Sequence, residues 1–334
     1  MELIRPGTKI PFTSYRKIAV IVSTIVNLAV LMMLFIKGPN LGVDFAGGTM
    51  VHLKFQQKVS IPDIRQALDK VNLGGSTIQD FGDAGANEFL VRLDKTSVEL
   101  GALGAQIKKA LAGQFGGDKF EVRRIESVGP KIGEDLRWRG TISVIAATIM
   151  MGVYIWIRFG AAFGARFGLH FALGAVIALI HDVLVTVGAL LLANYEFDLT
   201  VIAALLTIVG FSVNDTVVIC DRIRENLRKI KRETLESIVN TSINETLSRT
   251  ILTTSTALMV LFALYFLGGA VIRPFAFSLL VGFVSGVYST IFIASPVILL
   301  WDKGTRKRLQ RSEVGGRKSE IGMRNEETKG QTKT

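Results

Sequence analysis

The chain has 334 residues, of which 49% are hydrophobic, and a formal net charge of +11. A soluble domain can reach this hydrophobic fraction, so the distribution of the apolar residues decides the class of protein. They form runs long enough to cross a hydrocarbon core, which takes ~20 residues of helix, and these runs exclude an ordinary soluble protein. The one cysteine, Cys220, excludes an internal disulfide.

The first apolar run covers residues 18–36 and contains no charged side chain. We predict that it forms transmembrane helix 1, preceded by a cytoplasmic N-terminus at residues 1–17. The run is longer than a signal-peptide core and lacks a small-residue cleavage site, so we expect the helix to be retained.

Residues 37–137 are too polar to be buried in lipid and indicate a folded outer domain. Strand-like and helix-like patterns follow the order strand-helix-strand-strand-helix-strand, which predicts a ferredoxin-like α/β sandwich. The strands are expected at 50–55, 77–81, 88–93 and 119–125, and the helices from Ser60 and over 97–114. This segment contains no His/Cys cluster, nucleophile elbow or phosphate loop. We therefore expect no metal, no cofactor and no enzymatic activity, but a binding or mechanical role.

Five further apolar runs follow the outer domain. They predict transmembrane helices 2–6 at 138–157, 168–192, 199–220, 251–270 and 274–301, with a basic cytoplasmic loop at 221–250. The composition of the basic cytoplasmic tail, 302–334, predicts disorder. The predicted fold class is a polytopic α-helical membrane protein, with six transmembrane helices and a ferredoxin-like α/β outer domain between helices 1 and 2.

Lys and Arg residues concentrate on one side of the predicted membrane. They precede helix 1, occupy the turn between helices 2 and 3, and are dense in the 221–250 loop and the tail, whereas the link between helices 3 and 4 has none. The positive-inside rule then places both termini in the cytoplasm and residues 37–137 outside. We expect the basic clusters to set this topology and to contact anionic lipid, with no nucleic acid as a partner.

Few ionisable side chains lie at membrane depth, where they are costly and are therefore functional candidates. His181 and Asp182 lie near the middle of predicted helix 3, and Asp215 lies in helix 4 beside Asn214. Arg249 stands at the start of the hydroxyl-rich fifth helix. We expect this polar strip to face the bundle interior.

Asp215 and Arg249 allow two interpretations. Burial favours the neutral form of a carboxyl group, and a nearby arginine favours the ionised form. If Arg249 approaches and leaves Asp215, the proton affinity of the acid depends on conformation, as a proton-driven machine requires. Alternatively, the two residues form a static pair that only fixes helix packing. The sequence leaves both interpretations open.

His181 and Asp182, with Asn214, are candidates for a secondary relay. A rise of ~1.5 Å per residue places Asp182 roughly 17 Å from the outer end of helix 3 and Asp215 roughly 26 Å from that of helix 4. We therefore do not expect the two carboxyl groups to share a hydrogen bond, and tilt or water would have to bridge the gap. Proton transfer and a structural polar contact both stay open for His181 and Asp182.

At these residues the chain resembles the SecF family, the smaller member of the SecD/SecF pair in bacterial protein export. The most specific motif covers 209–226, and others match in order at 128–130, 181–188, 248–250 and 266–269. The family's motif outside the first helix matches at Gly42, Asp44, Phe45, Gly47, Gly48 and Thr49.

The resemblance implies membership of the resistance-nodulation-division superfamily and a twelve-helix assembly with SecD in the bacterial cytoplasmic (inner) membrane. It further implies that this assembly works with the SecYEG channel and the motor ATPase SecA. The proton gradient would then promote late steps of preprotein translocation and release. Asp215 matches the family's proton-carrying aspartate and Arg249 its arginine partner, while the coupled ion, proton or sodium, stays open.

Two other functions are weighed against this one. Half of a proton-driven small-molecule efflux transporter would have an apolar cleft accessible to lipid or drug, and usually a second large outer loop. A purely structural translocon scaffold would tolerate neutral replacement of Asp215 and Arg249. An intramembrane hydrolase is disfavoured, because the sequence shows no paired catalytic Asp, HExxH or Ser–Lys arrangement at membrane depth.

Overall fold

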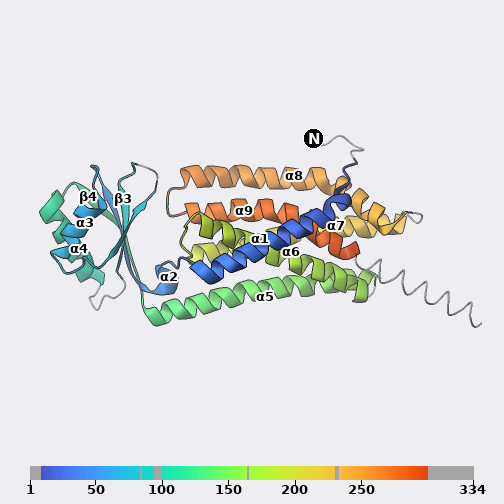
Figure 1. Cartoon of the computed structure of the whole chain (residues 1–334), viewed down its shortest axis with the longest axis horizontal. Coiled ribbons are helices and arrows are strands. Elements are labelled where there is room, and N and C mark those ends of the chain that lie inside the picture. Colours follow the sequence, from blue (N-terminus) through green and yellow to red (C-terminus); the bar gives the residue numbers. More distant parts are fainter. Residues whose placement is uncertain (1–8, 83–84, 94–99, 164, 230–232, 300–334) are drawn as a thin grey trace, which may run out of the picture.

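The computed structural model describes residues 9–82, 85–93, 100–163, 165–229 and 233–299. A bundle of long helices carries a small sheet-containing domain at one end (Figure 1). The predicted tail, 302–334, lies outside the described residues, as do residues 1–8 of the predicted N-terminal segment.

Six helices of the described chain are long and apolar enough to cross a membrane, which confirms the six-helix prediction. They are α1 (Arg16–Lys37), α5 (Pro130–Phe163), α6 (Ala165–Leu192), α7 (Leu199–Lys229), α8 (Leu235–Leu267) and α9 (Arg273–Ser289). A short helix, η1 (Phe12–Tyr15), precedes α1, and a π-helical segment, η2 (Thr290–Ala294), continues α9. The chain is therefore a multi-pass membrane protein.

Three of the six helices form the centre of the bundle. In their most apolar windows, α6 and α7 are 50% buried and α9 is 67% buried, against 11% for α1, 22% for α5 and 17% for α8. The peripheral helices accordingly keep large apolar side chains on the outside, where lipid or another membrane helix can cover them. Polar residues of α6, α7 and α9 are therefore largely enclosed by protein, as are Thr250 and Thr254 on one side of α8.

The helices extend beyond the apolar runs that predict them. α5 begins at Pro130 rather than at 138, and the predicted loop 221–250 is largely helical, because α7 continues to Lys229 and α8 begins at Leu235. Hydropathy detects only the segment that crosses hydrocarbon. The polar ends are joined by ion pairs instead, such as Arg222 Nε to Glu245 Oε2, 2.7 Å, between α7 and α8.

The outer domain has the predicted ferredoxin-like order. It comprises β1 (Gly48–Phe55), α3 (Ile61–Asp69), β2 (Thr77–Phe81), β3 (Glu88–Leu93), α4 (Leu100–Phe115) and β4 (Phe120–Val128). The strands form one antiparallel sheet in the order β2-β3-β1-β4. The Ser60 side chain accepts a hydrogen bond from the Asp63 amide and caps α3, as its place before the helix predicts.

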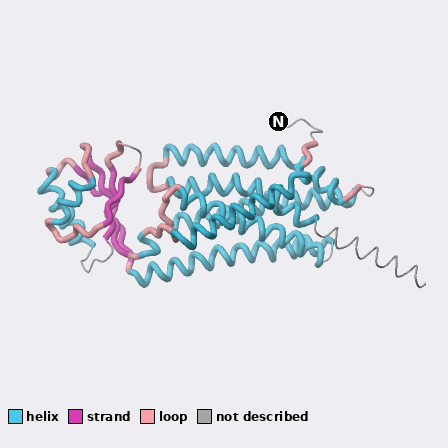
Figure 2. The backbone as a smooth tube through the Cα atoms, viewed as in Figure 1, coloured by secondary structure: helices cyan, strands magenta, loops and turns pink. Residues whose placement is uncertain are grey.

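The two faces of this sheet differ because successive side chains of a strand point to opposite sides. Val51, Leu53 and Phe55 of β1 are buried in a core beneath α3 and α4. Met50 and His52 point to the other face. The two helices lie on the side of the sheet away from the bundle, so this second face is turned toward the membrane helices (Figure 2).

A short segment between α1 and β1 ties the outer domain to the bundle. It contains α2 (Val43–Ala46), and Gly47 follows with a φ of 74°. A Cβ at Gly47 would lie 2.8 Å from the Pro130 Cα at the start of α5, so the close approach requires glycine. The Gly42 amide also donates to the Phe197 carbonyl, 2.8 Å, just before α7.

Candidate functional site

Asp215 lies near the middle of α7, buried between helices. Only 4% of the residue is exposed, and its Oδ2 has no hydrogen-bond partner among the described residues. The buried hydroxyls of Thr250 and Thr254 on the neighbouring α8 are likewise without partners in the described chain. Buried polar atoms are normally paired, so such unpaired atoms indicate water, an ion or a proton-transfer role.

Arg249, the predicted partner of Asp215, lies on α8 with an exposed side chain. The α7 and α8 helices pack against each other, but no ion pair within 4.0 Å joins the described Arg249 and Asp215 side chains. The structure therefore places the two residues on adjacent helices without a direct salt bridge between them. A conformation in which the pair closes is the feature that the relay hypothesis requires.

Asp182 of α6 is fully buried and forms the centre of a hydrogen-bond network among the three central helices. Its Oδ1 accepts from the Ser285 hydroxyl at 2.7 Å, and its Oδ2 accepts from Ser212 at 2.7 Å and Ser289 at 2.8 Å. His181 Nδ1 lies 3.2 Å from Oδ1. Ser212 belongs to α7, and Ser285 and Ser289 belong to α9, so one carboxyl group joins all three helices.

Asp182 and Asp215 share no hydrogen bond in the described structure, as their predicted depths imply. Ser212 connects them indirectly, because it bonds Asp182 and lies less than one helical turn before Asp215 on α7. Asn214 is exposed on α7 and takes no part in the Asp182 network. The structure thus places His181 and Asp182 together and Asn214 apart from them.

The serines of α9 were missed by reasoning from the sequence. Ser278, Ser285 and Ser289 are all buried, and their spacing of seven and four residues places them on one face of a helix. Three hydroxyls on one face of a membrane helix predict a polar partner on a neighbouring helix. Asp182, the most central buried acid, is that partner for Ser285 and Ser289.

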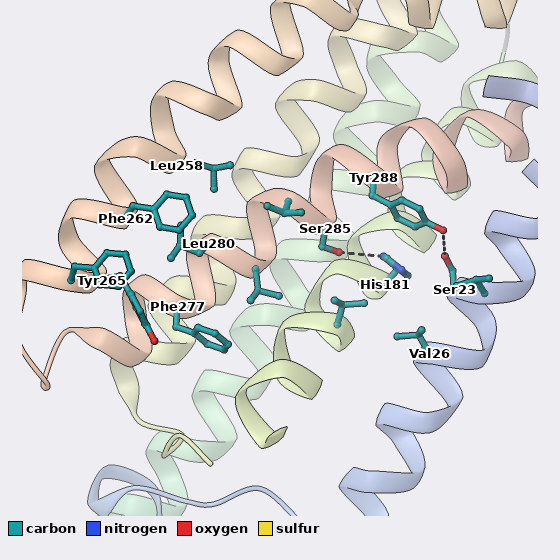
Figure 3. A pocket seen from close by; sticks show the side chains of 15 residues that line it. Ser23, Val26, His181, Leu258, Phe262, Tyr265, Phe277, Leu280, Ser285 and Tyr288 are labelled. Carbon is teal, nitrogen blue, oxygen red and sulfur yellow. Dashed lines mark hydrogen bonds between the residues drawn. The ribbon is translucent and has the colours of Figure 1, made fainter. Parts of the chain in front are cut away.

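A largely apolar groove of about 700 Å³ opens between α1, α6, α8 and α9 (Figure 3). Aromatic side chains such as Phe262 and Phe277 line one end, and His181 and Tyr288 lie at the other (Figure 3). The Tyr288 hydroxyl lies 3.0 Å from the hydroxyl of Ser23 on α1. His181 therefore lies between the groove and the buried Asp182 carboxyl.

The outer end of α7 bonds the segment that precedes β1. The Leu199 amide, at the start of α7, donates to Asp44 Oδ2 at 3.0 Å, and Phe197 forms a parallel bridge with Leu41. A carboxylate at a helix N-terminus satisfies a free amide and favourably meets the helix dipole. Asp44 and Gly42, both in the predicted motif, thus attach the outer domain to the helix that carries Asp215.

Comparison with known proteins identifies the class to which this fold and these residues belong. The family model for the protein export membrane protein SecD/SecF, C-terminal, matches residues 106–304, and that for the SecD/SecF GG motif matches residues 33–59. The second match covers the segment in which Gly47 contacts α5. The chain belongs to the SecD/SecF family of protein-export membrane proteins.

Its relatives within the family carry the name protein translocase subunit SecF. The SecF of Desulfurispirillum indicum is 47% identical over 298 residues, covering 87% of this chain and 91% of the relative. The SecF of Calditerrivibrio nitroreducens is 41% identical over 311 residues, covering 92% and 99%. These relatives are transport subunits by name.

Two solved structures of SecDF share the fold. The translocon-associated SecDF from Thermus matches with a TM-score of 0.78 and 32% identity over 89% of this chain. SecDF in its super-membrane-facing form matches with a TM-score of 0.66 and 33% identity over 94%. The chain spans only 39% and 41% of those two longer chains.

Proposed function

We propose that this chain is an accessory subunit of the Sec protein translocase. With SecD, it uses the proton motive force to promote late steps of preprotein translocation and release across the bacterial cytoplasmic membrane. Support comes from the SecF relatives, of which the chain covers nine-tenths or more. The observation that carries the proton role is the buried Asp215 carboxyl oxygen that lacks a partner in the described chain.

Asp215 is proposed to be the proton carrier and Arg249 its conformational partner. When Arg249 is apart from Asp215, burial favours the neutral, protonated acid, and when it approaches, its charge favours release of the proton. Each exchange would change the attraction between α7 and α8, which pack against each other. Proton movement along the gradient would therefore favour alternation between two packings of these helices.

The α7 helix is proposed to carry this movement to the outer domain. Asp215 lies between four and five helical turns from Leu199 along α7. At that outer end, Asp44 and Gly42 bond the α7 N-terminus and the residues just before it. A tilt or shift of α7 would then move the base of the outer domain, which meets the preprotein outside the membrane.

SecD is the proposed partner that completes the membrane domain. Arg249, Thr253 and Thr256 are exposed along one side of α8 at helical spacing. A polar strip of this kind suits a neighbouring protein helix better than lipid. The match of this chain to two-fifths of a SecDF chain supports SecD as that neighbour. SecYEG, SecA and anionic lipid are the further proposed contacts, with both termini in the cytoplasm.

The test is Asp215→Asn in vesicles reconstituted with the SecD partner, the SecYEG channel and SecA. We expect the variant to keep ATP-driven export and to lose the part that depends on a proton gradient. Asp118→Asn, an exposed acid in the outer domain, is the matched control and should export as the wild type does. Proton-dependent export at the wild-type rate in Asp215→Asn would remove the proton role.

The efflux alternative is favoured by one observation, the apolar groove between α1, α6, α8 and α9. A second large outer loop, which that alternative also predicts, is replaced by the short link 193–198 between α6 and α7. Vesicles with this chain and SecD should show no gradient-driven uptake or release of lipophilic dyes. Dye transport that depends on Asp215 would favour efflux over protein export.

A further inference from the structure

One face of the outer-domain sheet has no layer of helices upon it. The core side chains of β1–β4 point to α3 and α4, and the alternate side chains point toward the membrane helices. This open face carries Met50, His52, Gln79, Phe81, Leu90, Arg124 and Glu126. It mixes apolar and charged groups, unlike the wholly apolar core side.

A cleft of about 350 Å³ lies between this open face and the outer ends of the membrane helices. Its second wall consists of residues 193–196, Asp198 and Thr200 at the α6–α7 link, with the α8–α9 turn around Ala270. The volume is in the ~300–1,000 Å³ range of pockets that hold ligands. The cleft is therefore large enough for side chains of an unfolded polypeptide.

Acidic groups outnumber basic ones in this cleft. Its lining includes Asp44, Asp80, Glu126, Glu196 and Asp198, against Arg124 and Arg273. Among the described residues, no group of acids, His or Cys is close enough together to hold a metal ion. The excess negative charge is thus spread along the cleft, which suits a cationic side chain on an extended partner more than a bound ion.

Burial makes the charge of two of these acids costly. Burial raises the pKa of the Glu196 carboxyl, Arg92 opposes this, and Asp198 raises it further. Burial also raises the pKa of Glu126, against the opposing charge of its ion-pair partner Arg124. A cation that enters the cleft would stabilise the ionised form of both acids.

We propose that this cleft binds an extended segment of the exported polypeptide that carries a Lys or Arg side chain beside apolar residues. The inference rests on the proposed function, because that function supplies the polypeptide. Met50, Phe81 and Leu90 would contact its apolar side chains, and Glu126 and Glu196 would pair with its cation. The cleft lies directly above the α7 N-terminus, so a bound segment would move with that helix.

Photo-crosslinking in the complete complex with SecD tests whether the cleft binds the exported polypeptide. A p-benzoylphenylalanine at Gln79 lies on the open face, and the control at Gln66 is exposed on α3, on the far side of the sheet. With a translocation-stalled preprotein, we expect crosslinks from position 79 and none from 66. Equal crosslinking at both positions would overturn the proposal, and so would crosslinks from position 79 to SecD or SecYEG alone.

A second set of variants tests whether the charge of Glu196 contributes to binding of the polypeptide segment. Glu196→Gln should weaken crosslinking to a Lys-bearing segment by about fivefold, the effect of losing one half-buried charge pair. Glu121→Gln, an exposed acid of β4 outside the cleft, should leave it unchanged. Replacing the Lys of the segment by Glu should abolish the effect of Glu196→Gln. Equal crosslinking of the Lys and Glu segments would contradict the charge argument.

The experiment separates this proposal from the proton role. Asp215→Asn should stop proton-dependent export while leaving crosslinks from position 79, because binding in the cleft does not require the proton. If Asp215→Asn loses proton-dependent export, the proton role stands. If the wild type then gives no preprotein crosslinks from position 79, the cleft proposal alone is overturned.

Discussion

At the scale of residues, the two buried carboxyl groups of the membrane domain have opposite surroundings. Asp182 receives hydroxyl donors from α7 and α9, whereas Asp215 Oδ2 lacks a partner among the described residues. A carboxyl group with all its donors in place is held by the network around it. We therefore propose that Asp182 fixes the packing of the central helices and that Asp215 carries the proton.

The Asp182 network makes a prediction about stability. Asp182→Ala leaves the hydroxyls of Ser212, Ser285 and Ser289 without their acceptor inside the bundle, and should cost about 3 kcal/mol of unfolding free energy. Thermal unfolding of the full chain in detergent measures the effect, with Asp118→Ala as the exposed control. An unchanged melting temperature in Asp182→Ala would show that the network does not hold the helices together.

Glu88 of β3 makes a prediction about pH in the outer domain. Burial raises its pKa, but hydrogen bonds from Lys54 and His52 and the charge of Arg123 outweigh burial, so the pKa is lowered overall. Because the folded value lies below the unfolded one, the contribution to stability is present above the unfolded pKa and is lost as pH falls through the folded pKa.

Unfolding of the wild type and Glu88→Gln, compared at neutral and acid pH, tests this sign. The variant should be less stable than the wild type at pH 7, and the difference should shrink toward about pH 4 and below. A difference that grows as the pH falls would contradict the assignment.

At the scale of elements, the sequence predicts the features that depend on periodicity. The apolar runs locate all six membrane helices, and β2 and β3 have the predicted bounds, because alternation and run length are local properties. Contacts between distant segments are not local. The spacing of the α9 serines indicates a polar partner on another helix, but it does not identify Asp182 as that partner. The bond from Leu199 to Asp44 likewise joins distant segments and could not be predicted from one element.

Gly47 tests the junction between the outer domain and α5. Gly47→Ala adds a Cβ that would lie 2.8 Å from the Pro130 Cα, at a φ of 74° that side chains rarely adopt. We expect a loss of at least ~1 kcal/mol in unfolding free energy. Gly75→Ala, where a Cβ meets nothing within 4 Å, is the matched control and should be nearly neutral. Equal stability of both variants would show that the close approach is not required.

Asp44 tests the junction with α7. Asp44→Ala removes the acceptor of the Leu199 amide and should cost about 1 kcal/mol, typical of a lost helix cap. If α7 moves the outer domain, the larger effect is on function, and proton-dependent export should fall while ATP-driven export continues. Export assays of the reconstituted complex measure this. If Asp44→Ala responds fully to the proton gradient, the bond between Asp44 and Leu199 does not transmit movement from α7 to the outer domain.

At the scale of the whole molecule, we propose that the bundle and the outer domain act together as one transducer. The Asp215 site is on α7, the α7 N-terminus bonds the base of the outer domain, and the cleft lies above that bond. Along the chain, the outer domain follows α1 and is followed directly by α5 (Figure 1). Movement of α7 relative to α1 and α5 would therefore change the angle of the sheet above the membrane.

The most direct test of this account measures a distance between the two parts. The buried Cys220 is replaced by Ala, and spin labels are placed at Gln66 on the outer domain and at Leu192, exposed at the outer end of α6. In the complex with SecD, the account predicts two distance distributions whose populations shift between about pH 5.5 and pH 8, and one unchanging distribution in Asp215→Asn. The same pH-dependent shift in Asp215→Asn would contradict it.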